Sequence, residues 1–453
     1  MRRVVKVSRI RIIITIIVVV LTTLLTGCTG KEPNEIAYVV ALGIDSTDDD
    51  NYKITIQYAN TTQISGGASE SGGKAGSEIV DNVTIEAPNI YAGVGLANNI
   101  VSKSFSMSHA KLIVFSKEIA EKGVKDMIET LVRSEEIRPD VFIAVANTTA
   151  NDYLTSVNPE MEVNPAQYYQ LIYQKNQLVG IPDGQLREFF TGLYTDNYDS
   201  ILPVAGVIEG AGGNSQNDDK GQSKDSQNEG SEGSSESLDS FESKNSDENE
   251  KEKDAEKNTS KYEYDIKNYV GGETAIEKKN KAEAIGAAVF EKDKMVGELG
   301  EVETEICKIL KGDYTYSYLT YYNNDTPDIP ITVKTTQQKK PKYKIDTDKK
   351  TVDIELYIES DLYSLPADYN VENKIEDFER DVANYTSSAC TEFINNFTKK
   401  YNSDILKLNE KVKYKFLTNN QYNWFKKNVG WSEYKFSVCT NFKVRRTGLI
   451  VRE

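Results

Sequence analysis

The chain has 453 residues, of which 54 are basic and 70 acidic, giving a net charge of −16. This acidic balance argues against nucleic acid as a partner and against spreading on an anionic lipid surface. The length predicts two or three domains rather than one.

The first 27 residues have the pattern of a signal peptide. Residues 2 to 11 carry five basic side chains and no acid, and an uncharged, mostly apolar run follows from residue 12 to 27. That run is shorter than the roughly 20 apolar residues that cross a bilayer core. A basic start followed by a short apolar run is typical of a secretory signal. The alternative interpretation is a single uncleaved span.

Leu25, Thr26, Gly27 and Cys28 close the apolar run and resemble the lipobox of bacterial lipoproteins. The resemblance implies cleavage before Cys28, a diacylglycerol on its sulfur, and an acyl chain such as palmitate on the new amino group. One acyl chain holds a protein only weakly, whereas two or three hold it durably. We therefore expect Cys28 to anchor the chain on the extracytoplasmic face of a membrane. Loss of the five basic residues would bring the net charge from −16 to about −21.

The segment from residue 36 to 147 alternates strands and helices. Residues 36–45 and 52–60 predict two strands joined by a polar turn, and residues 86–103 predict a helix. A strand ending at Ser116, a helix over 123–137 and a strand over 141–147 predict a crossover unit that packs on a sheet. The apolar face of that helix is formed by Val124, Met127, Ile128, Leu131 and Val132.

Residues 211–260 differ in composition from the rest of the chain. They contain 14 acids and six lysines, a net charge of −8, and only four apolar residues. Such a segment cannot bury enough apolar surface to offset the entropy of ordering it, so we predict a disordered insert over 211–262. The alternative is a tail that binds a cation or a basic partner. The Gly- and Ser-rich residues 65–78 predict a flexible loop.

The part after the insert predicts a hairpin, a helix and further strands. In the hairpin, Gly286 and two alanines indicate a close approach, and Asp293-Lys294 is the expected turn. Two strands follow over 343–360, and the last strand is expected over 436–444. The longest helix lies between them, with an apolar seam of Ile375, Phe378, Val382, Tyr385, Ala389, Phe393 and Phe397. We expect an antiparallel sheet with helices on one side.

The predicted fold class is α+β, with mixed and antiparallel sheets covered by helices and three domains in all. The signal peptide occupies residues 1–27 and an N-terminal α/β domain residues 28–200. A middle domain over 201–305 contains the disordered insert, and a C-terminal α+β domain spans 306–453.

The residue types give no positive indication of catalysis. His109 is the single histidine, which removes the common Ser-His-Asp and His-rich metal sets from consideration. Cys307, Cys390 and Cys439 cannot all pair and lack metal-binding spacing, so we expect buried apolar thiols. The SGGKAG stretch fails the phosphate-loop pattern, and STDDDN lacks the rhythm of a calcium loop. We expect no enzyme activity, metal or cofactor, and the sequence singles out no ligand-binding residue.

Five blocks that follow the lipobox in order resemble the Ger(x)C family, the C subunits of bacterial spore nutrient-germinant receptors. The first runs from Glu35 to Asp45 through Leu42-Gly43-Ile44-Asp45. The third, fourth and fifth blocks are residues 286–299, residues 403–412, and Trp424 with the closing strand. The second block, which precedes them, contains Ser108, His109, Glu118, Ala120, Gly123, Arg133, Glu136 and Arg138. The family usually carries glycines where Lys407 and Asn409 stand, which indicates a different local turn.

The resemblance implies three extracytoplasmic domains held at the inner membrane of the spore. It also implies a complex with an A-type and a B-type integral membrane subunit that senses nutrients, with no catalytic activity of its own. The implied role is assembly and signal coupling during germination. A solute-binding lipoprotein of an import system is the alternative hypothesis, and an envelope hydrolase is a third.

Overall fold

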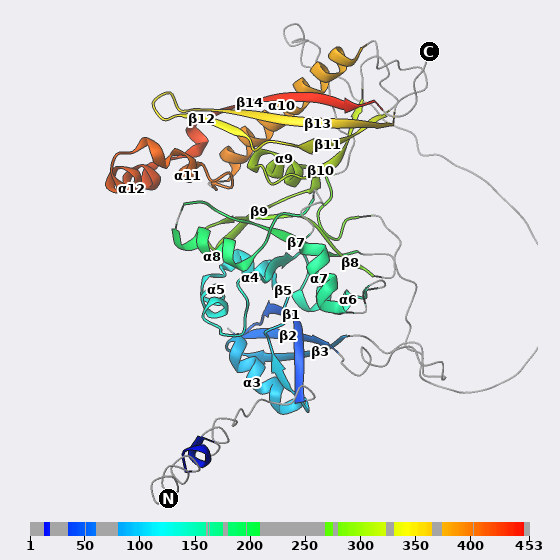
Figure 1. Ribbon diagram of the computed structural model, residues 1–453, viewed down its shortest axis with the longest axis vertical. Coiled ribbons are helices and arrows are strands. Elements are labelled where there is room, and N and C mark those ends of the chain that lie inside the picture. Colours follow the sequence, from blue (N-terminus) through cyan, green and yellow to red (C-terminus); the bar gives the residue numbers. More distant parts are fainter. Residues whose placement is uncertain are drawn as a thin grey trace, which may run out of the picture. The chain divides into compact units, whose positions relative to one another are not determined.

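The described strands form two sheets (Figure 1). The structure is a computed structural model and describes residues 13–18, 35–49, 51–59, 80–159, 162, 164–174, 180–195, 197–208, 268–274, 280–322, 330–364, 374–401 and 403–447. All of these residues belong to one compact unit. The lipobox and the predicted insert over 211–262 lie outside the described residues.

The larger sheet has nine described strands and a parallel centre. Its order is β3-β2-β1-β5-β6-β7-β8-β9, with β4 paired to β1. The strands β1, β5, β6 and β7 run parallel, and antiparallel pairs flank them at both edges. Their bounds are β1 (Ile36–Ser46), β2 (Tyr52–Ala59), β3 (Val80–Ala87), β4 (Ser104–Ser106), β5 (Leu112–Ser116), β6 (Phe142–Ala146), β7 (Ile201–Val207), β8 (Ala282–Glu291) and β9 (Lys294–Leu299).

The elements predicted before the insert are confirmed. The first hairpin is formed by β1 and β2, and α3 (Ile90–Ile100) lies within the predicted helix 86–103. The expected crossover joins β5 to the parallel β6 through α4 (Lys117–Lys122) and α5 (Lys125–Val132). Val132 is the exception on the predicted apolar face, because it is exposed.

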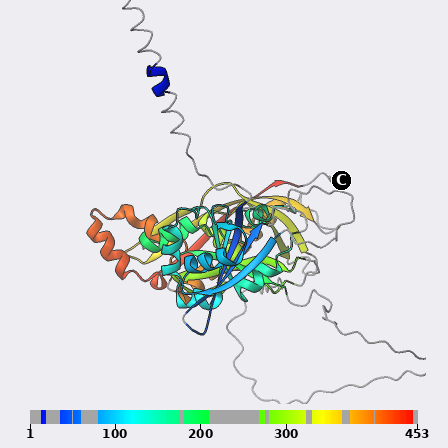
Figure 2. The ribbon, with the colours of Figure 1, turned by 90° about the horizontal axis from the view of Figure 1, so that it is seen from below.

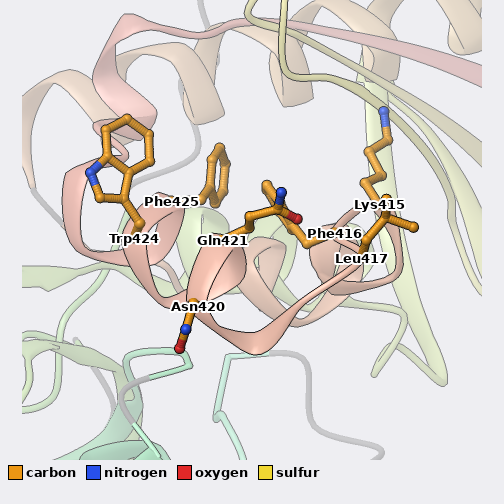
Figure 3. A pocket seen from close by; sticks show the side chains of 7 residues that line it. All are labelled: Lys415, Phe416, Leu417, Asn420, Gln421, Trp424 and Phe425. Carbon is orange, nitrogen blue, oxygen red and sulfur yellow. The ribbon is translucent and has the colours of Figure 1, made fainter.

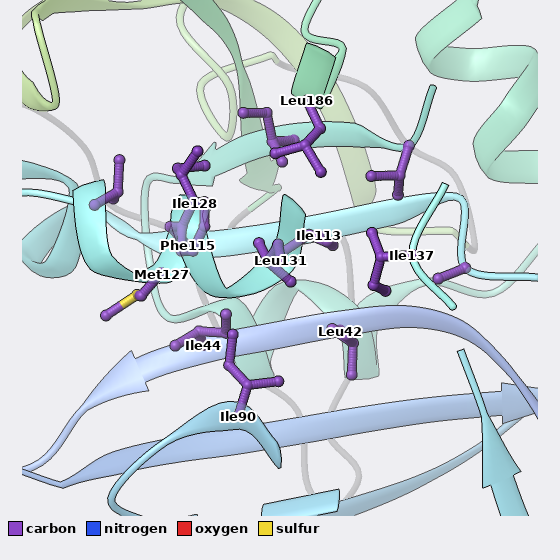
Figure 4. Packing of buried hydrophobic residues seen from close by; sticks show 14 of the residues in the cluster. Leu42, Ile44, Ile90, Ile113, Phe115, Met127, Ile128, Leu131, Ile137 and Leu186 are labelled. Atoms are coloured by element: carbon purple, nitrogen blue, oxygen red, sulfur yellow. The ribbon is translucent and has the colours of Figure 1, made fainter. Parts of the chain in front are cut away.

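Both faces of the nine-stranded sheet are buried at its parallel centre. Every residue of β5 and β6 is buried, which fits parallel strands covered by helices on both sides. On one face, Leu42, Ile44, Ile113 and Phe115 pack under helices α3, α4, α5 and α8 (Leu186–Thr195) (Figure 4). Burial of this cluster is the main apolar contribution to the stability of the sheet.

The opposite face is covered by α6 (Ala150–Ser156) and α7 (Pro165–Gln174), and it contains buried tyrosines. The hydroxyls of Tyr153 and Tyr173 lie 2.9 Å apart, and Tyr169 donates to Gln57 Oε1 over 2.5 Å. Gln57 Nε2 donates to the carbonyl of Leu154 over 2.8 Å. Because each of these polar groups has a partner, the tyrosines can be buried without an unpaired hydroxyl.

The hairpin of β8 and β9 continues the same sheet beyond residue 200, where the sequence predicts a domain boundary. The division into three domains stays a prediction. Gly286 has φ +84°, and a Cβ there would lie 2.6 Å from the carbonyl oxygen of Leu299, so the predicted close approach is confirmed. The predicted turn is wrong by one residue, because Lys292 and Asp293 form it and Lys292 has φ +59°.

The second sheet has five described strands in the order β10-β11-β13-β12, with β14 paired to β13. We expected an antiparallel sheet, and this is wrong for one pair, because β13 and β14 run parallel. The long helix α10 (Ile375–Lys400) carries the chain back before β14 begins, as in a crossover connection. The bounds are β10 (Tyr316–Tyr322), β11 (Pro330–Gln337), β12 (Lys342–Asp346), β13 (Thr351–Ser364) and β14 (Lys435–Arg446).

The helix α10 covers one face of this sheet. Phe378, Val382, Tyr385 and Phe397 of the predicted seam are buried. The seam shifts by one residue in its second half, where Cys390 and Ile394 are buried in place of Ala389 and Phe393. A straight helix drifts relative to a fixed repeat, which accounts for the shift.

Two of the three cysteines are buried as predicted. Cys307, in α9 (Glu301–Lys311), and Cys390 are buried, but Cys439 is exposed. Alternate residues of a strand point to opposite faces, and the odd-numbered residues of β14 face away from α10. Cys439 is one of them, so the prediction of a buried thiol is wrong there.

A matched pair of leucine substitutions tests the core. Leu42 in β1 is 0% exposed and Leu96 in α3 is 47% exposed. We expect Leu42→Ala to lower the free energy of unfolding by about 3–5 kcal/mol, because it leaves a cavity between sheet and helices. Leu96→Ala is expected to change it by less than about 0.5 kcal/mol. Equal losses in denaturant titrations of the two variants would contradict this assignment of the core.

Candidate partner-binding surface

The predicted lipidation residue Cys28 and the lipobox residues Leu25, Thr26 and Gly27 lie outside the described residues. The anchor therefore stays a prediction. In the described part of the chain, no helix is long and apolar enough to span a membrane. No cluster of three or more His, Cys, Asp or Glu side chains with the geometry of a metal site occurs there either.

The Leu42–Asp45 block positions α6 on the large sheet. A Cβ at Gly43 would lie 3.0 Å from the side chain of Leu154, so the glycine allows close packing of the helix. The carboxylate of Asp45 accepts hydrogen bonds from the backbone N–H of Ala150 (2.6 Å) and Asn151 (3.0 Å). Burial raises the pKa of Asp45, and these two bonds oppose the shift. The Leu42–Asp45 block therefore contributes to the packing of α6 against the large sheet.

The block around β5 meets the β8–β9 hairpin. Gly123 has φ +121°, and a Cβ there would lie 2.7 Å from the carboxylate of Asp293. The next residue, Val124, donates its N–H to the carbonyl of Asp293 over 3.0 Å. Gly123 thus permits the close contact between two blocks that lie far apart in the sequence.

Polar residues of the same block also have local partners. The carboxylate of Glu136 accepts the N–H of Met107 over 2.7 Å, and Arg138 forms a bidentate pair with Asp140 at 2.9 and 3.0 Å. The His109 ring packs edge-on against Tyr38, and its Nδ1 lies 3.0 Å from the Ser108 hydroxyl. These contacts assign His109 a structural environment.

The Ser403–Val412 block joins the two sheets. Ser403 donates its hydroxyl to the carbonyl of Phe290 in β8 over 2.9 Å. The N–H of Asp404 donates to the carboxylate of Asp199 over 2.8 Å, and the N–H of Asp199 donates back to the carbonyl of Asp404 over 3.2 Å. Asp199 also accepts the N–H of Lys292 in the hairpin turn over 2.8 Å. Asp199 could not be found from local sequence patterns, because its partners lie about 90 and 200 residues away.

The carboxylate of Asp404 begins α11 (Leu408–Val412). It accepts the N–H groups of Leu408 and Asn409, each over 2.8 Å. Burial raises the pKa of Asp404 to about 7, although the two backbone hydrogen bonds favour the charged form. A buried carboxyl thus fixes the helix that follows it.

Lys407 occupies the position where the resemblance indicates a glycine. Its φ of +57° is in the left-handed region, which favours glycine. The lysine keeps this conformation while its ammonium lies 3.2 Å from the Glu188 carboxylate and 4.1 Å from the centre of the Tyr198 ring. The turn keeps the geometry for a glycine, and the side chain adds contacts to the region around α8.

The next helix, α12 (Asn419–Asn428), lies at the edge of the described chain in both overall views (Figures 1 and 2). Its inner side is fixed. The hydroxyl of Tyr422 lies within hydrogen-bond distance of Asn197 Oδ1 (3.1 Å) and of the carbonyl oxygen of Asn409 (3.2 Å), and Lys426 donates to the carbonyl of Thr195 (2.9 Å). The helix is therefore held against both α11 and the end of α8.

The outer side of this region contains a groove of about 680 Å³ (Figure 3). It is lined by Lys415, Phe416, Leu417, Asn420, Gln421, Trp424 and Phe425. The side chains of Leu417 and Trp424 are 95% and 70% exposed, and Tyr414, three residues before Leu417 in the sequence, is 78% exposed. Large apolar side chains exposed together are typical of a binding surface, whereas single ones are common on any protein. We take this groove as the candidate partner-binding surface.

Comparison with known families matches two domains in chain order. Residues 30–207 match the spore germination protein N-terminal domain, and residues 285–448 match the spore germination B3/GerAC-like C-terminal domain. The chain belongs to the Ger(x)C family. This family comprises C subunits of germinant receptors and is not a known enzyme family. The resemblance of the five blocks is thereby confirmed.

Individual relatives match shorter stretches. Spore germination protein KC of Bacillus subtilis (strain 168) is 26% identical over 174 residues, covering 35% of this chain and 42% of the relative. Spore germination protein B3 of the same organism is 26% identical over 148 residues, covering 30% and 36%. The chain thus matches about two fifths or less of the length of these relatives. The crystal structure of the GerBC protein has a TM-score of 0.48 and 15% identity, covering 89% of this chain and 96% of that one.

The buried Asp404 predicts a pH dependence of stability. Its pKa rises from 3.8 to about 7 on folding, so the folded protein holds this proton more tightly than the unfolded chain. Its stabilising contribution is complete below the unfolded pKa and declines as the pH rises through about 7. We expect the unfolding free energy of wild type, relative to that of Asp404→Asn, to fall between pH ~4 and pH ~7. A difference that stays constant in urea titrations across this range would contradict the assignment.

Proposed function

We propose that this chain is the lipid-anchored C subunit of a spore nutrient-germinant receptor and acts in assembly and signal coupling. The observation that carries the proposal is the match to two spore germination domains in chain order, over residues 30–207 and 285–448. Family membership also supports a spore-associated membrane location. In this proposal the protein lies on the extracytoplasmic face of the inner spore membrane.

The proposed anchor is the lipid on Cys28. The support is the sequence order of a basic start, a short apolar run and Leu25-Thr26-Gly27-Cys28. Only seven residues separate Cys28 from the start of β1 at Ile36. At about 3.5 Å per residue this link spans at most roughly 25 Å, so the anchor would keep the large sheet next to the bilayer.

The proposed partners are the A-type and B-type integral membrane subunits. The family blocks of this chain are used largely for packing within the chain, as the contacts of Asp45, Gly123 and Asp404 illustrate. Partner contacts are therefore expected on surfaces outside those buried residues. The proposal includes no catalytic step and no cofactor.

A solute-binding lipoprotein is not favoured. Such proteins hold a ligand between two similar βαβ lobes. Here a nine-stranded sheet with a parallel centre is followed by a five-stranded sheet in which three of the four pairings are antiparallel. The two halves of the described chain therefore differ in topology.

A pair of cysteine substitutions tests the anchor. Cys28→Ala is expected to abolish acylation, move the protein out of the membrane fraction and impair nutrient-triggered germination of the spores. Cys439→Ala changes an exposed thiol in β14 and is expected to leave all three unchanged. The measurements are incorporation of labelled palmitate, fractionation of spore membranes and the rate of germination. Normal nutrient germination with a stable, unlipidated Cys28→Ala protein would refute the proposed anchor.

A further inference from the structure

Three exposed apolar side chains lie close together in sequence around the groove. Tyr414, Leu417 and Trp424 expose 78%, 95% and 70% of their surface. Leu417 follows Phe416 and Trp424 precedes Phe425, and these two neighbours are held in place. The ring of Phe425 packs against Phe416 (4.9 Å) and Trp431 (6.1 Å between centroids). The exposure is therefore a feature of a fixed surface.

The same segment is basic in an acidic protein. Residues 407–428 contain six lysines and a single acid, Glu410, a net charge of +5, while the whole chain has −16. Lys413, Lys415 and Lys427 are exposed. Lys427 lies three residues after Trp424 in α12, so the two side chains project from the same side of the helix. The ammonium of Lys415 donates to the carbonyl of Ile345, so we call Tyr414, Leu417 and Trp424 with Lys413 and Lys427 the basic aromatic patch.

We propose that the basic aromatic patch binds the surface of an anionic lipid bilayer. Tryptophan and tyrosine favour the interface between water and hydrocarbon, since each combines an apolar ring with a polar group. Leucine contributes apolar area that can leave water, and lysines keep their ammonium groups at the level of the lipid phosphates. All of these residue types are present among the exposed side chains of residues 413–427.

The negative charge of the whole chain does not prevent this contact. At physiological ionic strength the Debye length is about 8 Å, so charges farther away are largely screened. Half of the net charge, −8, belongs to residues 211–260. The sequence-based expectation that the chain avoids anionic lipid treats the charge as evenly spread. A bilayer at the patch would meet a local positive charge, to which the exposed Lys413 and Lys427 contribute.

The inference extends the proposed function and rests on it for its biological setting. A lipid on Cys28 would bring the protein to the bilayer, and the patch would add a second, weaker contact that limits its orientation. The contact itself is a property of the protein surface. It can therefore be measured on protein without lipid.

The test is vesicle flotation of the chain from Thr29 to Glu453, which retains both sheets and every helix that covers them. We expect binding to vesicles of equal parts phosphatidylglycerol and phosphatidylcholine, weaker binding at high salt, and little binding to phosphatidylcholine alone. Leu417→Glu is expected to weaken binding at least about tenfold. Substituting Lys413 and Lys427 by Gln is expected to weaken it about fivefold per lysine.

The matched control is Leu171→Glu in α7, which introduces the same change at a leucine that is 40% exposed outside the patch. It is expected to bind vesicles like wild type. Equal losses for Leu417→Glu and Leu171→Glu, or no binding of wild type to the anionic vesicles, would overturn the inference. Since the tested protein carries no lipid, either failure leaves the receptor proposal intact.

Tryptophan fluorescence provides a second measurement. The chain has two tryptophans, and Trp431 is buried while Trp424 is exposed. In a Trp431→Phe variant, Trp424 is the single emitter, and we expect its emission to shift to shorter wavelength when anionic vesicles are added. An unchanged spectrum under conditions in which the protein floats with the vesicles would show contact through another surface and would also overturn the inference.

Discussion

The contacts between Asp199 and Asp404 hold the two sheets of this protein together. Asp199 accepts backbone N–H groups from Lys292 in the β8–β9 turn and from Asp404, while Asp404 uses its own carboxylate to begin α11. The carboxyl of Asp404 is buried, where an unpaired polar group is costly, and Asp199 is partly buried. Each accepts short hydrogen bonds from backbone N–H groups. The position of α11, and of α12 after it, depends on this arrangement.

This constraint connects the packing of the chain with its surface. Because Tyr422 and Lys426 hold the inner side of α12 against Asn197 and Thr195, the outer side can expose a tryptophan and lysines without losing the helix. The family blocks supply much of the internal framework, so their recurrence has a structural explanation in glycines that permit close contact and aspartates that cap helices. The surfaces available for contacts outside the chain are then the exposed ones. The groove beside Trp424, whose exposed residues we assign to the lipid bilayer, is an example.

Local sequence patterns predicted most of the helices and strands. Contacts between segments that lie far apart in the sequence could not be predicted from such patterns. Alternation in residues 436–444 gave β14, but alternation is the same for a parallel and an antiparallel neighbour, so its direction was missed. The seam of α10 was correct at Phe378 and Val382 and drifted by Phe393. Blocks containing Asp45 and Asp404 were singled out by resemblance, but their capping roles depend on folded contacts. The basic character of residues 407–428, which surround the groove, was missed because the net charge of the whole chain conceals a local excess of lysine.

The central claim is that this chain works as a receptor subunit, and co-purification from spores tests it most directly. The protein would carry a C-terminal tag, spore membranes would be solubilised in mild detergent, and the proteins recovered with it would be identified by mass spectrometry. The account predicts recovery of an A-type and a B-type integral membrane subunit. Recovery of a permease and its ATPase in their place, or of the tagged chain alone from membranes in which both subunits are present, would contradict it.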